Sequence, residues 1–234
     1  MEKGIEDWIK KEGTVFLKKV GIRNGQTILD FGCRNGNYTI PVARIVGNDG
    51  LVYALDKDAS SLRTLRKKVE KDGFGNIVLL ETNGSLEINL EDNSLDVVLT
   101  YDVLHLIDNR KELYKQIYRV LREDGLFSVY PKHNKLDSPG WGLENMVPND
   151  ILKEIEGQNF HFEEEYCATL SHDDSLIYGC ILNFRKAESY QIKELEEQIE
   201  DLKARLPKHS IPPSMIQELE ELETKLENIK KSRK

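Results

Sequence analysis

The sequence contains little cysteine and no excess of positive charge. Three of its 234 residues are cysteine, at positions 33, 167 and 180. An odd number at such wide spacing matches neither a disulfide framework nor a zinc cluster, so we predict a reducing compartment and no metal-binding residues. The formal net charge of −8 provides no overall positive field for a phosphate backbone, which disfavours nucleic acid as a partner.

Long apolar runs are also missing. No stretch reaches the roughly 18 apolar residues of a membrane-spanning helix. The N-terminal segment MEKGIEDWIKKEG mixes charges where a signal peptide needs an uninterrupted apolar core. We therefore expect a cytoplasmic protein without a membrane partner.

Between about residues 26 and 185, short β-branched runs alternate with segments of helical period. This alternation is typical of βαβ units and predicts an α/β fold with a mostly parallel sheet. Two last β-rich runs flank the turn-like SHDD and predict an antiparallel hairpin at the sheet edge. The predicted strands are 27–31, 51–56, 76–81, 95–101, 126–131, 160–170 and 175–185, and the predicted helices are 38–47, 59–73, 110–125 and a short one from 151.

The composition changes near residue 187. Leucines, isoleucines and one methionine then recur at alternating spacings of three and four, first from 192 to 206 and again from 215 to 229. The segment PKHSIPP separates the two series, which predicts a coiled-coil-like αα-hairpin. We thus expect a domain at 1–186 and a helical tail at 187–234, whose apolar seam packs on itself, on the domain, or on another chain as a homodimer or protein partner.

The segment ILDFGCRNGNY, residues 28–38, runs from a predicted strand through a glycine turn into a helix. Backbone N–H groups at such a turn favour an anionic ligand group. Asp56 ends the next strand about 20 residues later, where a carboxylate accepts hydrogen bonds from ribose hydroxyls. Because Arg34 lies between Gly32 and Gly36, the turn fits a dinucleotide fingerprint poorly.

These motifs resemble a known family. ILDFGCRNGNYTIPVA followed by VYALDKD resembles the first two motifs of the class I S-adenosylmethionine-dependent methyltransferases. EDNSLDVVLTYDVLHLI and LYKQIYRVLREDGLFSVYP are similar to later segments of members that act on small molecules, including the ubiquinone and menaquinone biosynthesis group. The resemblance covers roughly residues 10–185 and implies a Rossmann-like sheet of seven strands and S-adenosylmethionine as cofactor.

Carried over position by position, the resemblance implies a set of cofactor-binding residues. Asp30 and Gly32 would lie at the methionine end, Gly36 at the close-approach turn and Asp56 on the ribose, while Tyr101 and Asp102 would border the transferred methyl group. The family's acidic adenine contact is missing, and Asn83 or Ser85 is expected in its place. The predicted set is Asp30, Gly32, Cys33, Arg34, Gly36, Asp56, Lys57, Asn83 and Tyr101.

Arg34 replaces the family's middle glycine. If its φ is negative, the loop keeps its path, and the guanidinium can point outward or pair with a carboxylate. If the loop demands positive φ, a residue other than glycine carries strain of about 1 kcal/mol or more. We expect a functional cofactor site with Arg34 in it.

Methyl transfer needs positioning of the acceptor and, where the acceptor loses a proton, a base. His105 and His133 are the base candidates because both are near the expected rim of the sheet, while Tyr101 is a third candidate that we expect to cover the cofactor. We predict methyl transfer to O, N or C of a small-molecule acceptor. The alternative is a non-catalytic protein of the same fold that acts as an interaction module through its helical hairpin.

Overall fold

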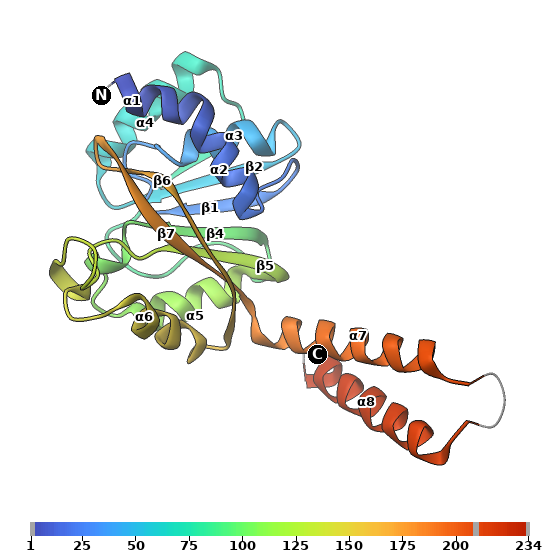
Figure 1. Cartoon of the computed structure of the whole chain (residues 1–234). Coiled ribbons are helices and arrows are strands. Elements are labelled where there is room, and N and C mark those ends of the chain that lie inside the picture. The colour runs from blue at the N-terminus through green and yellow to red at the C-terminus, as the bar shows by residue number, and fades with distance from the viewer. Residues whose placement is uncertain (1–2, 208–210, 233–234) are drawn as a thin grey trace. The chain divides into compact units, whose positions relative to one another are not determined.

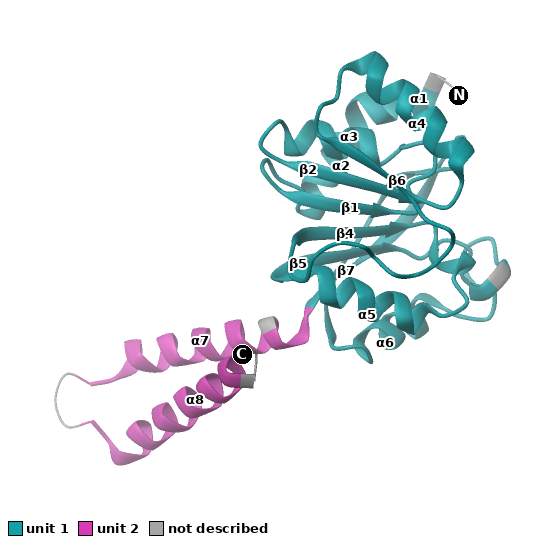
Figure 2. Cartoon of the chain, turned by 180° about the vertical axis from the view of Figure 1, so that it is seen from behind, with its two compact units in different colours: residues 1–185 teal, residues 186–234 magenta. Residues whose placement is uncertain are grey.

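The computed structural model describes residues 3–207 and 211–232. The chain forms two compact units, residues 1–185 and 186–234 (Figure 2). The first unit contains a seven-stranded sheet in the order β3-β2-β1-β4-β5-β7-β6 (Figure 1). Strands β3, β2, β1, β4 and β5 pair in parallel, and β7 pairs antiparallel with β5. This topology confirms the predicted fold class, including the edge hairpin.

The elements follow one another in the alternation that the sequence predicts. The strands are β1 (Thr27–Phe31), β2 (Leu51–Asp56), β3 (Ile77–Glu81), β4 (Leu95–Tyr101), β5 (Leu121–Tyr130), β6 (Phe160–His172) and β7 (Ser175–Lys186). The helices of the first unit are α1 (Lys3–Asp7), α2 (Gly13–Val20), α3 (Thr39–Val46), α4 (Ala59–Asp72), α5 (Arg110–Val120) and α6 (Pro148–Glu156), with short turns η1 (Trp8–Glu12), η2 (Leu104–Leu106) and η3 (Trp141–Leu143).

Helices cover both faces of the sheet. Figure 1 shows α2, α3 and α4 on one side and α5 and α6 on the other. Successive strand residues point to opposite faces, so Ile28 and Val97 belong to the core on the α3 side, while Leu29 and Val98 belong to the core on the α5 side. Burial on both faces explains the continuous apolar character of the central strands.

The predicted helix 110–125 is too long. Helix α5 ends at Val120, and residues 121–125 begin β5 instead. Leu121 pairs with Leu95 of β4, and the Arg122 guanidinium lies 2.5 Å from the Asp96 carboxylate. Pairing with β4 overrides the helical tendency of the segment REDG. A local sequence pattern does not reveal such contacts between distant segments.

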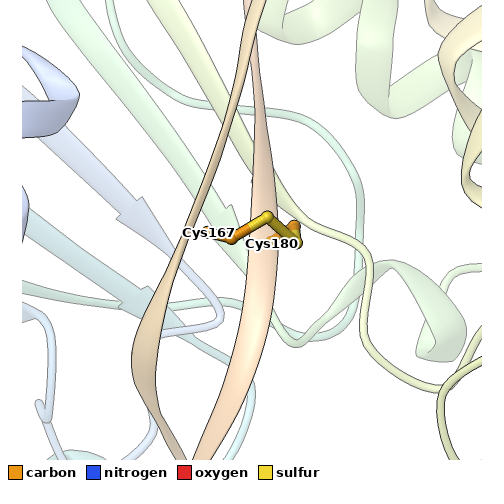
Figure 3. Close-up of a disulfide and its surroundings, with 2 residues drawn as sticks. All are labelled: Cys167 and Cys180. Carbon is orange, nitrogen blue, oxygen red and sulfur yellow. A yellow bond between two sulfur atoms is a disulfide. The ribbon is translucent and has the colours of Figure 1, made fainter.

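The prediction that the chain has no disulfide is wrong. Cys167 on β6 and Cys180 on β7 are joined by a disulfide across the hairpin (Figure 3). The sequence places the two cysteines on neighbouring strands but not opposite each other, because that depends on the register of the hairpin. The expectation of a reducing compartment rested on this cysteine count and loses that support.

The tip of the β6–β7 hairpin lies against the segment that follows β1. The Tyr38 hydroxyl donates a hydrogen bond to the Ser171 carbonyl oxygen at 2.8 Å, and Asn37 Nδ2 donates to Ser171 Oγ at 2.9 Å. Further along the hairpin, the Trp8 indole N–H donates to the Thr169 carbonyl at 2.9 Å. Through these contacts the β6–β7 hairpin covers the loop to which the sequence assigns the cofactor.

The second unit is an antiparallel pair of helices, α7 (Ala187–Arg205) and α8 (Pro213–Ser232) (Figure 2). Ion pairs join them, with Lys203 Nζ 2.7 Å from Glu223 and Lys230 Nζ 2.6 Å from Glu196. The two helices confirm the predicted αα-hairpin. Among helices built from described residues, none combines the length and apolar character needed to cross a bilayer.

Candidate functional site

The carboxyl ends of the parallel strands meet at one rim of the sheet, which is where ligands bind in open α/β folds. Polar side chains lie at or just beyond the carboxyl ends of four strands. They are Asp30 in the last part of β1, Asp56 at the end of β2, Asp102 directly after β4, and His133 shortly after β5. Two cavities open here, one of about 660 Å³ and a smaller one of about 60 Å³. Gly32, Arg34, Asp102 and Asp173 line both of them.

The two glycines of the loop after β1 have different roles. Gly32 has φ +81°, and a Cβ there would lie 2.6 Å from Val103 Cγ2, so only glycine fits between the cavities and the segment after β4. Gly36 has φ +80°, and its added Cβ would meet Leu65 Cδ1 of α4 at 2.3 Å. Gly36 lines neither cavity. The close approach that the sequence predicts at Gly36 is thus to helix α4.

Arg34 has φ +45°, so the loop does demand the left-handed conformation. Its backbone N–H donates to Asp56 Oδ2 at 2.7 Å, and its guanidinium forms an ion pair with Asp173 in the β6–β7 turn. Of the two expectations for this residue, the strained one applies, at about 1 kcal/mol. The ion pair joins the loop to the hairpin tip, and the side chain stays at the wall of both cavities.

Asp30 is a buried carboxyl group beside the smaller cavity. Its Oδ2 accepts a hydrogen bond from the Thr39 hydroxyl at 2.6 Å, and 3% of the residue is exposed. Burial, with a smaller contribution from the nearby charge of Asp56, raises the pKa of Asp30 to about 6, although the hydrogen bond from Thr39 partly opposes the rise. A cationic ligand group beside Asp30 would offset the cost of the buried negative charge, so this position is suited to such a group.

Asp56 is anchored by the backbone around it. Its two oxygens accept from the N–H groups of Arg34, at 2.7 Å, and Asp58, at 2.8 Å. Asp58 in turn caps α4, because its carboxylate accepts from the N–H groups of Ser60 and Ser61. The anchoring fixes the Asp56 carboxylate at the wall of the larger cavity, and the exposed Lys57 lines the same wall.

The far wall of the larger cavity comes from the segment after β3. Thr82, Gly84, Ser85 and Leu86 line it, whereas Asn83 does not. The Asn83 side-chain oxygen accepts from the Ser85 N–H at 2.9 Å and so shapes the turn. Asn83 and Ser85 are the two residues expected in place of the family's acidic adenine contact, and of these only Ser85 lines the cavity.

Tyr101 and Cys33 are interior residues at the smaller cavity. The Tyr101 hydroxyl lies 2.8 Å from Ser128 Oγ, and its ring packs edge-on against Tyr38 with centroids 4.8 Å apart. Burial raises the pKa of both the Tyr101 hydroxyl and the Cys33 thiol. Neither group is set up to ionise, so both serve as packing at this point of the wall.

Three histidines gather around Asp102 at the larger cavity. His172 Nδ1 lies 2.5 Å from Asp102 Oδ2, while His105 Nδ1 and His133 Nε2 lie 3.7 and 3.8 Å from Asp102 Oδ1. Burial lowers the pKa of His105 to about 4, so its ring is neutral at pH 7. The sequence predicts His105 and His133 near this rim but not His172, whose only sequence signal is its place in the SHDD turn.

Three comparisons place this site among known proteins. A family model described as "Methyltransferase domain" matches residues 29–129. Demethylmenaquinone methyltransferase of Lactobacillus johnsonii is 31% identical over 122 residues, which cover 52% of this chain and 48% of that protein. A ubiquinone/menaquinone biosynthesis C-methyltransferase of Haemophilus ducreyi is 31% identical over 148 residues, covering 62% and 56%. The chain thus spans about half the length of these curated relatives.

The solved structures agree on the fold. A SAM-dependent methyltransferase from Aquifex aeolicus superimposes with a TM-score of 0.64 at 20% identity, covering 76% of this chain and 92% of that one. The matched family region runs from β1 to β5 and contains the glycine loop, Asp56 and Asp102. S-adenosylmethionine is the cofactor of this family. Over residues 29–129 the chain thus matches a methyltransferase domain, and its fold is the one found in SAM-dependent methyltransferases.

Proposed function

We propose that this chain binds S-adenosylmethionine and transfers its methyl group to a small-molecule acceptor. The observation that carries the proposal is the continuity of the rim. The glycine loop and Asp56, which carry the family motifs, line the same cavity of about 660 Å³ as Asp102 and the three histidines. One cavity therefore offers room for a cofactor and for an acceptor next to it.

The residues present fit the cofactor. The buried Asp30 carboxylate suits the ammonium group of the methionine part, and Asp56 is positioned for the ribose hydroxyls. When bound, the cofactor supplies a methyl group on a sulfonium, which is already a strong electrophile. The task left to the protein is to orient the acceptor and to exclude water, and the contacts of the hairpin tip with Arg34, Asn37 and Tyr38 serve that end.

For the acceptor, we propose a small hydroxylated aromatic molecule such as a naphthoquinol. The names of the relatives, which refer to menaquinone and ubiquinone biosynthesis, support this choice. The test is transfer of a radiolabelled methyl group from S-adenosylmethionine to a panel that includes a reduced naphthoquinone, a catechol and an amine. Labelled product from the quinol supports the proposal, and labelling of the amine alone contradicts the acceptor class.

The non-catalytic alternative makes a different prediction in the same assay. If the chain binds S-adenosylhomocysteine but labels no acceptor in the panel, the result supports an interaction module and contradicts methyl transfer to these acceptor classes.

For the tail, we propose self-association through α7 and α8, because their apolar residues have a heptad-like spacing. Light scattering on the full chain tests it, since a dimer is the expected mass and a monomer contradicts it.

A further inference from the structure

Asp102, His105 and His133 bring three metal-binding side chains to one point of the larger cavity. Asp102 Oδ1 lies 3.7 Å from His105 Nδ1 and 3.8 Å from His133 Nε2, and all three atoms lie within 4.8 Å of one another. Around a tetrahedral zinc ion with bonds of ~2.0–2.1 Å, ligand atoms are separated by roughly 3.3 Å. Small side-chain movements close that difference.

A hydrogen bond of His133 directs its other ring nitrogen toward Asp102. His133 Nδ1 lies 2.9 Å from the Ser138 carbonyl oxygen, which only accepts, so Nδ1 carries the proton. In the neutral ring Nε2 then has the lone pair, and it faces Asp102 Oδ1. This oxygen is buried and accepts no hydrogen bond within the described part of the chain. At 3.8 Å the two atoms are too far apart to share a proton, and a cation between them removes their repulsion.

Two further features match a metal site. His172 Nδ1 donates to Asp102 Oδ2 at 2.5 Å, which is how outer residues hold a ligating carboxylate in place. Asp102 and His133 both have positive φ, +56° and +65°, at the ends of adjacent strands. Strained backbone of this kind persists where the surroundings hold a side chain in a functional position.

We propose that Asp102, His105 and His133 bind a divalent first-row transition metal ion, for which Zn²⁺ is the probe. Two imidazoles and one carboxylate leave coordination positions open toward the cavity. The alternative triad, Asp102, His172 and Asp173, is less suitable because Arg34 already neutralises Asp173 and His172 Nδ1 already carries a proton toward Asp102. This proposal replaces our sequence-based expectation of no metal ligands.

The role of the ion rests on the proposed function. An acceptor hydroxyl that coordinates the ion loses its proton to solvent more readily, as metal-bound water does. The electron pair left on oxygen then makes that oxygen, or the aromatic carbon conjugated to it, the nucleophile. The chemical class that this site recognises is therefore a small molecule with an ionisable hydroxyl group.

The test is calorimetric titration of tag-free, chelator-treated full-length protein with Zn²⁺, and with Co²⁺ followed by its d–d absorption. We expect one ion per chain. Asp102→Asn and His133→Asn remove a ligand while keeping a residue that tolerates positive φ, and each should weaken binding by more than about 100-fold. His172→Gln should weaken it by ~10–100-fold as an outer residue. His161→Asn, a histidine outside the cluster, should change nothing.

Absence of saturable Zn²⁺ binding to the wild type overturns the proposal. So does binding that survives both Asp102→Asn and His133→Asn. Titration of the same samples with S-adenosylhomocysteine keeps the two proposals apart. Cofactor binding without metal binding defeats only the metal site, and metal binding without cofactor binding defeats only the proposed function.

Discussion

The two halves of the rim are built in different ways. The half that we propose for the cofactor comes mainly from one stretch, residues 30–36, and from Asp56 on the neighbouring strand. The half that we propose for the acceptor gathers Asp102, His133 and His172 from the ends of three strands, and His172 meets Asp102 across 70 residues of sequence. The first half depends on local backbone conformation, and the second depends on how the β6–β7 hairpin is held. Changes in the two halves should therefore have separable effects.

The largest effect is expected at Asp30, where stability and cofactor binding oppose each other. Its pKa is about 6 in the fold against a usual 3.8, so the folded protein loses stability as the pH rises from about 4 through 6. About two pKa units correspond to roughly 3 kcal/mol at pH 7. Asp30→Asn should raise the free energy of unfolding by up to that amount and abolish S-adenosylhomocysteine binding.

Chemical denaturation at several pH values checks this. The gain from Asp30→Asn should be nearly full above pH 6 and vanish only below the usual Asp pKa of 3.8, because the carboxyl group is protonated in both the folded and the unfolded state there. Asp58→Asn is the matched control: the pKa of Asp58 is lowered by its hydrogen bond with Ser61, so no gain at pH 7 is expected there. A loss of stability in Asp30→Asn at pH 7 contradicts the inference that ionisation of the buried Asp30 carboxyl group destabilises the fold.

The next effect concerns the acceptor half and its disulfide. The Cys167–Cys180 bond closes a loop with a sequence separation of 13, for which chain entropy gives about 3 kcal/mol. A Cys167→Ser, Cys180→Ser double variant should lose stability by about that much without reductant and match the wild type after reduction. Cys33→Ser, at the buried free cysteine, should keep the full response to reductant. Identical stability of the oxidised and reduced wild type would contradict a stabilising role for the disulfide.

A smaller effect separates close packing from backbone strain in the cofactor half. Gly32 and Gly25 both have φ +81°, but only at Gly32 would a Cβ meet a neighbour, Val103 at 2.6 Å. Each change to alanine should cost about 1 kcal/mol of stability through φ. Gly32→Ala alone should weaken S-adenosylhomocysteine binding by more than about tenfold, or 1.4 kcal/mol. Equal binding losses in the two variants indicate that general destabilisation is the cause.

The smallest effect is expected where the halves touch, at Arg34 and Asp173. Arg34→Gly relieves about 1 kcal/mol of φ strain and loses an exposed ion pair worth about 0–1 kcal/mol, so stability should change little. Asp173→Asn loses the pair without relieving strain and should be the less stable variant. S-adenosylhomocysteine affinity should change by less than about tenfold in Arg34→Gly. Much tighter binding means that the arginine obstructs the site.

The sequence predicts the features that depend on local patterns. Strand positions, the glycine turn after β1 and the Asp58 cap of α4 follow from apolar runs, glycine placement and capping chemistry. Asp30 and Asp56 follow from the family motif on the same strands. In these cases the residues that decide the structure are close in sequence.

What the sequence does not predict depends on pairings between distant segments. The end of α5 is decided by Leu95, the disulfide by the hairpin register, and the place of His172 by the reach of the hairpin tip. Gly36 and Asn83 are near the site in sequence, yet Leu65 and the Ser85 N–H respectively determine their roles. A motif thus identifies the segment, and tertiary packing selects which of its side chains reach the cavity.

The most direct test of the central claim is calorimetric titration of the full chain with S-adenosylhomocysteine, alongside Asp30→Asn and Gly32→Ala. We expect saturable binding of one molecule per chain to the wild type, binding that is abolished in Asp30→Asn and binding that is weakened in Gly32→Ala. No binding to the wild type at millimolar ligand contradicts a working cofactor site in the loop that contains Arg34.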